Sequence, residues 1–270
     1  MIRMILVPTD FSECAGYALH AAALFARHFS ATVRVIHCSR VPENWQPGDH
    51  QEHRAVPEME SLASDMRNRF PEVPLVCDTC EGRLVDIIRD YVDRHGVDLL
   101  CMGSHGASGK SEYFIGSNTQ KVVRCVHRPV LVVKEPMTDL VLDKVVFASD
   151  FSAEEEGAFL QFKEIVKHFV PEIHLLMVRT SALFEGPPAR GIEAMAHFLP
   201  LCAPLKGFTH VYQDFNVDQG IRSFSHAIGA SLVGISNHQR HPLRRLLTGS
   251  NVEALINHSA LPVLSIDYEA

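Results

Sequence analysis

The chain contains the same pattern twice. Residues 5–13 (ILVPTDFSE) are similar to residues 145–153 (VVFASDFSA), where an apolar run ends in Asp-Phe-Ser. Residues 116–133 are similar to residues 249–266, because Gly-Ser-Asn and Pro-Val-Leu recur at the same spacing. Matches at a nearly constant offset predict two copies of one folding unit of about 135 residues.

The chain of 270 residues is long enough for two domains of ordinary size. Polar and turn-forming residues at 134–143 separate two strand patterns and mark the boundary. We therefore expect domains at residues 1–137 and 138–270.

Within each copy, short apolar runs alternate with helical stripes, which predicts an α/β fold. The runs are nearly continuous, as in a mostly parallel sheet with helices on both faces. We expect five strands in each copy, at residues 4–8, 32–38, 74–80, 97–103 and 129–134, and at 143–149, 172–178, 207–213, 231–235 and 262–266.

The charge, the hydrophobicity and the cysteine content of the chain limit the kinds of partner and location to be expected. The net charge of −7 does not favour nucleic acid as a partner, since phosphate backbones attract basic surfaces. No apolar run approaches the length of a membrane span. The seven cysteines are an odd number and several lie in apolar runs, which indicates reduced thiols in a cytoplasmic protein.

Ligands of parallel sheets bind at the carboxyl ends of strands, near the reversal of strand order. In the first copy Asp10, Cys38 and the loop after Met102 occupy such ends. Asp10 could accept hydrogen bonds from an adenosine, or it could cap the following helix. The residue alone does not decide between these roles.

The loop GSHGASGKSEYFIGSN, residues 103–118, is rich in glycine. Gly103, Gly106 and Gly109 would permit a close approach of backbone to a ligand, and a helix opening near Gly116 would favour a phosphate. Lys110 does not stand in a Walker arrangement, so the loop is no P-loop. A Ser-x-x-Gln capping box, formed by Ser117 and Gln120, is the structural alternative.

The spacing of Gly103, Gly106 and Gly116-Ser117 resembles the ATP-binding pattern of the universal stress protein family. The first strand ending in Pro-Thr-Asp and the strand RPVLVVK are also similar to that family. The resemblance covers both copies, so the chain looks like a tandem universal stress protein. It implies two Rossmann-like, adenine nucleotide α-hydrolase-like domains that pair internally through the strands at 129–134 and 262–266.

The resemblance also implies the ligand and its contacts. The ligand would be ATP, with Mg²⁺ as a candidate companion, and the activity at most a slow ATPase. The adenosine and ribose would meet Pro8, Thr9, Asp10, Cys38, Met102 and Gly103, and the phosphates would meet Gly106, Gly116, Ser117, Asn118 and Thr119.

The second copy departs from the pattern. Ser236 and Gln239 replace Gly103 and Gly106, and the loop carries Arg240, Pro242, Arg244 and Arg245. A glutamine would place a side chain where backbone has to approach phosphate. We therefore expect the first domain to bind ATP and the second to bind it weakly or not at all.

Other readings stay open. Cys77-x-x-Cys80 could be a redox or metal pair, although it lies in a predicted strand, and structural thiols are the alternative. His105 could contact phosphate or be an exposed turn residue. For function, a nucleotide-dependent stress-response protein competes with an ATP-using enzyme of the same fold group and with a non-binding pseudo-dimeric interaction protein. Association into a homodimer is left open.

Overall fold

The computed structural model describes residues 1–39, 57–105, 116–180, 188–237 and 251–267, with the side chains of 188–191 left out. By their contacts these residues form two compact units. The first comprises Met1–Val126 and Pro136–Leu140, and the second comprises His127–Glu135 and Val141–Ala270. None of the helices in these described parts is both long and apolar enough to cross a bilayer.

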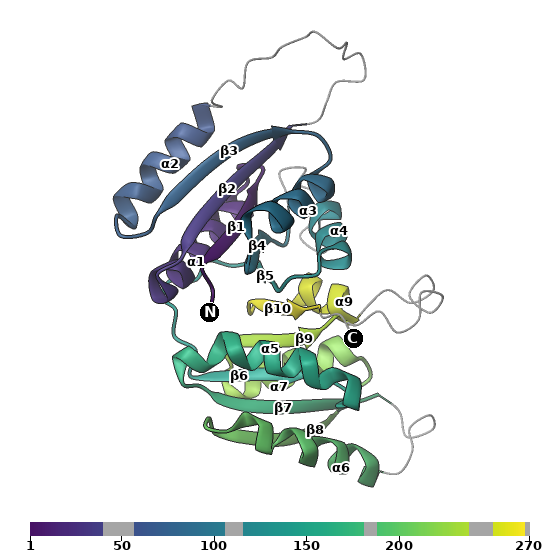
Figure 1. Ribbon diagram of the computed structural model, residues 1–270. Helices are drawn as coiled ribbons and strands as arrows, with labels where there is room; N and C mark the ends of the chain where they lie inside the picture. The colour runs from purple at the N-terminus through teal and green to yellow at the C-terminus, as the bar shows by residue number, and fades with distance from the viewer. Residues whose placement is uncertain (40–56, 106–115, 181–187, 238–250, 268–270) are drawn as a thin grey trace. The chain divides into compact units, whose positions relative to one another are not determined.

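The first unit has four parallel strands in the order β3-β2-β1-β4 (Figure 1). Its strands are β1 (Met4–Thr9), β2 (Thr32–Ser39), β3 (Leu75–Glu81) and β4 (Leu99–Gly103). Its helices are α1 (Glu13–Phe29), α2 (Pro57–Arg69), α3 (Leu84–His95) and α4 (Ser117–Cys125). The chain builds outward from β1 to β3 and then crosses to β4 on the other side of β1. The strand order therefore reverses at β1, where ligands of such sheets bind.

The second unit has six strands in the order β5-β10-β9-β6-β7-β8, all parallel except the pair of β5 and β10. They are β5 (Val130–Val133), β6 (Lys144–Ala148), β7 (Glu172–Arg179), β8 (Gly207–Gln213), β9 (Leu232–Ser236) and β10 (Val263–Ile266). The helices are α5 (Glu156–Val166), α6 (Pro188–Phe198), α7 (Val217–Ile228) and α9 (Asn251–His258), with 3₁₀ turns η1 (Ala153–Glu155), η2 (Lys167–Phe169) and η3 (Pro200–Cys202).

The ten expected strands are all present, five in each copy, and the α/β fold class is confirmed. The expected pairing of the last strands is present as well: β5 and β10 run antiparallel, with Leu131 opposite Leu264. By contacts β5 belongs to the second unit, although it is the fifth strand of the first copy.

The cores of the two units are filled differently. In the first, α1 buries Ala18, Ala21, Ala22 and Ala23, whose small side chains let the helix lie close to β1 and β4. In the second, phenylalanines fill the equivalent layer, where the ring of Phe147 lies 5.3 Å from that of Phe159 and 5.2 Å from that of Phe162. Such apolar burial is the main stabilising contribution in both.

Candidate functional site

The turn after β1 is fixed by its own side chains. Thr9 Oγ1 accepts a hydrogen bond from the Phe11 amide at 3.0 Å, and Asp10 Oδ1 accepts one from the Ser12 amide at 3.1 Å. Phe11 has a left-handed φ of 61°. Ser12, rather than Asp10, is the N-cap of α1 and accepts from the Ala15 amide at 3.2 Å. Asp10 therefore does not cap the helix; it stabilises the turn and leaves its exposed side chain at the carboxyl edge of the sheet.

The second unit repeats this turn. Ser149 Oγ accepts from the Phe151 amide at 2.9 Å, Asp150 Oδ1 accepts from the Ser152 amide at 3.0 Å, and Phe151 has a φ of 55°. The Asp-Phe-Ser repeat thus has a structural cause in both copies. An aspartate here would be needed for the turn even in a domain that binds no ligand.

The end of β2 lies against this turn. His37 Nδ1 is 2.9 Å from the Thr9 carbonyl oxygen, and its ring centroid is 4.7 Å from that of Phe11. Cys38 follows and is half-buried, and burial raises the pKa of its thiol to about 12. Sequence reasoning missed Phe11 and His37, and the recurrence of Phe in both Asp-Phe-Ser motifs was the available signal.

The end of β4 lies against α1. Met102 is buried, and a Cβ on Gly103 would lie 2.7 Å from the Cys14 carbonyl carbon and 3.0 Å from the Ala15 nitrogen. Contacts that short do not occur in stable structures. The close approach of α1 is therefore sufficient reason for a glycine at position 103, whether or not a nucleotide also comes near.

Two hydrogen bonds close the base of the glycine loop. The Gly116 amide donates to the Ser104 carbonyl at 2.8 Å, and Thr119 Oγ1 donates to the Gly103 carbonyl at 2.8 Å. Ser104 is fully buried, and its Oγ lies 2.7 Å from His105 Nδ1. These contacts hold the start of α4 beside the end of β4. The half-buried His105 points inward to Ser104, which differs from an exposed turn histidine.

The described part of the chain places no side-chain cap at the start of α4. Its N-cap is Gly116, which has no side chain, so the predicted Ser117–Gln120 capping box is wrong. Ser117 and Asn118 are exposed, and the first turn holds no acidic residue. The amides of a first helical turn have no partner within the helix, and with the helix dipole they favour an anion.

The structure thus brings most of the predicted residues to one edge of the first unit. Pro8 and Thr9 are buried at the end of β1, Asp10 and Cys38 follow the ends of their strands, and the first turn of α4 lies beside the end of β4. Gly106, Gly109 and Lys110 lie outside the described residues. Within the described ranges no three His, Cys, Asp or Glu side chains gather in a way that could hold a metal ion.

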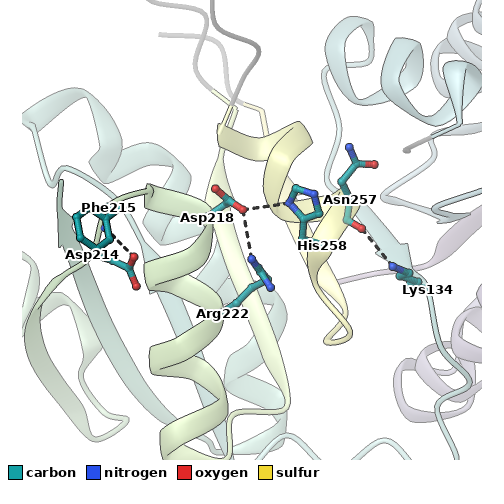
Figure 2. Close-up of polar contacts among 7 residues, drawn as sticks. All are labelled: Lys134, Asp214, Phe215, Asp218, Arg222, Asn257 and His258. Atoms are coloured by element: carbon teal, nitrogen blue, oxygen red, sulfur yellow. Dashed lines mark hydrogen bonds and ion pairs between the residues drawn. The ribbon is translucent and has the colours of Figure 1, made fainter. Parts of the chain in front are cut away.

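The corresponding helix of the second unit is α9, which is fixed by polar contacts (Figure 2). His258 Nδ1 lies 3.1 Å from Asp218 Oδ2, and an Arg222 nitrogen lies 3.6 Å from the same oxygen. Lys134 Nζ donates to the Asn257 carbonyl at 3.2 Å. Ser236 ends β9 at the position of Gly103. The loop residues 238–250, with Gln239, its arginines and Ser250, are outside the described part of the chain.

Comparison with known proteins agrees with this architecture. The family model described as the universal stress protein family matches residues 1–134 and again 142–266. Universal stress protein MJ0577 of Methanocaldococcus jannaschii is 28% identical over 155 residues, which cover 50% of this chain and 96% of that protein. Universal stress protein YxiE of Bacillus subtilis is 26% identical over 150 residues, covering 50% of this chain and 100% of YxiE.

Solved structures show the same fold over nearly the whole chain. A universal stress protein from Archaeoglobus fulgidus gives a TM-score of 0.71 at 18% identity, covering 98% of this chain and 96% of that one. A protein of unknown function, PA1789 from Pseudomonas aeruginosa, also gives 0.71, at 19% identity, with 98% and 92% covered.

Proposed function

Because the chain belongs to the universal stress protein family, matched once in each half, we propose that it is an ATP-binding stress-response protein whose nucleotide occupies the first domain. The observation that carries this proposal is the first turn of α4, which begins at a glycine N-cap and is held beside the end of β4 by the Gly116–Ser104 and Thr119–Gly103 hydrogen bonds. That arrangement presents the amides of a first helical turn to phosphates at the edge where the strand order reverses.

The geometry limits what each residue can contribute. Pro8 and Thr9 are buried, so they would line the adenosine site mainly with backbone, while the exposed Asp10 offers its carboxylate. The Thr119 hydroxyl already donates to the Gly103 carbonyl, so Thr119 would meet phosphate through its amide. Ser117 and Asn118 offer both amides and side chains. Cys38, Met102 and Gly103 would border the nucleoside, and Gly106 and Gly116 the phosphates.

We assign ATP to the first domain, residues 1–137, and little or no ATP to the second, residues 138–270. Gln239 would place a side chain where Gly106 allows backbone approach. The antiparallel pair of β5 and β10 supports an intramolecular pseudo-dimer of the two copies. Any hydrolysis would be slow, because we assign Asp10 to the nucleoside end, whereas phosphoryl transfer needs a metal-holding carboxylate near the phosphates.

Isothermal titration of the full chain with ATP tests the proposal. We expect one site per chain. The substitution Gly106→Gln, which imports the residue of the second copy, should weaken ATP binding by about tenfold or more, or ~1.4 kcal/mol. The reciprocal Gln239→Gly serves as the matched control and should leave the first site unchanged. Two equivalent sites per chain, or unchanged affinity in Gly106→Gln, would contradict the assignment.

A further inference from the structure

Two neighbouring strands of the first unit, β2 and β3, each carry a cysteine at the same level. In the parallel pair of β2 and β3, Cys38 lies directly opposite Cys80. Neighbouring strands are about 4.8 Å apart, and residues in register on parallel strands project to the same face. The Cα separation of a disulfide is about 4.4–6.8 Å, so the backbone spacing of this pair suits a bridge.

Cys77, the other cysteine of the Cys-x-x-Cys motif, cannot take this place. It lies three positions before Cys80 on the same strand, so the two side chains point to opposite faces of the sheet. Cys77 is in register with Val35, not with a cysteine. The motif therefore contributes one thiol to the pair, and the second comes from the neighbouring strand.

Both cysteines are partly exposed. Cys38 and Cys80 are free and half-buried, whereas Cys101 is fully buried. Cys80 Sγ lies 3.2 Å from the hydroxyl of Tyr91 on α3, so it faces the helix on that side of the sheet. Each cysteine is the next-to-last residue of its strand, since β2 ends at Ser39 and β3 at Glu81. Strand ends can make the small shift that brings Cβ atoms to the about 3.5–4.5 Å of a disulfide.

We propose that Cys38 and Cys80 are a redox-active dithiol that closes to an intramolecular disulfide by exchange with a low-molecular-weight disulfide. The Cys80 thiolate attacks one sulfur of the oxidant, which leaves a mixed disulfide and releases one small thiol. Cys38 then loses its proton to solvent and attacks Cys80 Sγ, which releases the second small thiol. Two protein thiols are oxidised and one small disulfide is reduced to two thiols. The inference does not depend on nucleotide binding.

The order of attack follows from the surroundings of Cys38. Burial and the neighbouring Cys80 raise the pKa of the Cys38 thiol to about 12, so its thiolate is scarce near neutral pH. Cys80 is therefore the first nucleophile. Cys38 reacts only once the mixed disulfide stands beside it, where proximity compensates for its low fraction of thiolate.

Peptide mapping of the full chain tests the pair. The folded protein is incubated with oxidised glutathione, remaining thiols are blocked with N-ethylmaleimide, and the digest is compared with and without reductant. Trypsin places Cys38 in the peptide 35–40, and both Cys77 and Cys80 in the peptide 70–83. We expect these two peptides to appear joined after oxidation and to separate on reduction.

Single substitutions identify the bonded sulfur. The joined peptide should persist in Cys77→Ser, the matched control, and fall to background in Cys80→Ser and in Cys38→Ser. The wild-type result stands by itself if a variant folds poorly. The proposal is overturned if the peptides stay separate in folded wild type while the maleimide labels both, if the link persists in Cys80→Ser, or if it joins two chains instead of one.

Discussion

At the end of β4, Gly103 lies against the first turn of α1, and the backbone of Cys14 occupies the space where a Cβ would be. The second copy has Ser236 at this position, and there the first turn after Asp-Phe-Ser is the 3₁₀ turn η1 instead of α-helix. The glycine on which a nucleotide-binding pattern depends is thus also demanded by packing. The two requirements coincide at one residue.

The substitution Gly103→Ala should destabilise the chain by about 1–3 kcal/mol, because backbone atoms of α1 would have to shift. Gly16→Ala is a suitable control, since Gly16 is exposed on α1 and an added Cβ meets nothing within 4 Å. There alanine should stabilise the helix by roughly 0.5–1 kcal/mol. Urea unfolding of both variants measures the difference, and equal effects would refute the packing account.

A histidine pair should make the stability of the second unit sensitive to acid. His174 Nδ1 lies 3.0 Å from His210 Nε2, between Phe208 and Phe224, with Glu172 and Lys144 as the charged neighbours of His174. Burial lowers the pKa of both imidazoles. Below the ordinary histidine pKa of about 6.5, the unfolded state then binds more protons than the folded state.

The unfolding free energy should therefore fall as pH is lowered from about 7.5 to about 5.5. The fall should be smaller in the double variant His174→Phe/His210→Phe, measured by urea unfolding at both pH values. His226→Phe, at an exposed position of α7, provides the comparison. A double variant with the same pH dependence as wild type would exclude the pair as the cause.

At the contact between β9 and α5, the sizes of the two facing side chains are reversed between the copies. A Cβ on Gly234 would lie 2.4 Å from the ring of Phe162, so the glycine makes room for the phenylalanine. By the sequence repeat the corresponding residues of the first copy are Cys101 and Ala22, both fully buried. One copy combines a larger strand residue with a small helix residue, and the other does the reverse.

This exchange predicts a strong coupling. Gly234→Cys should be destabilising alone, and Phe162→Ala should cost about 3–5 kcal/mol alone. The double variant Gly234→Cys/Phe162→Ala has the residues of the first copy at both positions. Its loss of unfolding free energy should be about 0.5–3 kcal/mol smaller than the sum of the two single losses. Pairing Phe162→Ala with Gly16→Ala should be additive. A double-mutant cycle by urea unfolding distinguishes coupling from additivity.

The elements themselves were predictable because their apolar periods are strong. All ten strands lie within a few residues of their expected positions. The carboxyl-edge positions of Asp10 and Cys38 followed from the same pattern. What could not be predicted depends on contacts between segments far apart in sequence. Three features are of this kind: the N-cap at Gly116, the close contact of the α1 backbone with Gly103, and the register of Cys38 with Cys80. The nucleotide contacts themselves stay predictions.

At the scale of the whole molecule, the domain boundary given by the sequence repeat differs from the boundary given by the contacts between residues. The repeat predicts a boundary near residue 137, whereas the contacts place β5 in the second unit, paired with β10. The side chains of Leu131 and Leu264 are almost fully buried there. A second domain cut at the repeat boundary would thus lose a strand of its own sheet.

We expect the fragment 127–270, which keeps β5, to be more stable and less prone to association than the fragment 138–270. Without β5, one edge of β10 would present unpaired backbone and apolar side chains, which favours association and aggregation. Urea unfolding and size-exclusion chromatography compare the two. Equal stability and equal elution behaviour would show that β5 contributes nothing to the second unit.

The same strand pair has a consequence for refolding. A long segment connects β5 and β10. Every molecule of the protein carries the same two strands, so β5 of one molecule can also pair with β10 of another. When many molecules refold together, β5 of one molecule can therefore pair with β10 of another in the same register as within a single chain. Concentrated refolding should yield interlocked dimers by strand exchange, and dilute refolding should yield single chains.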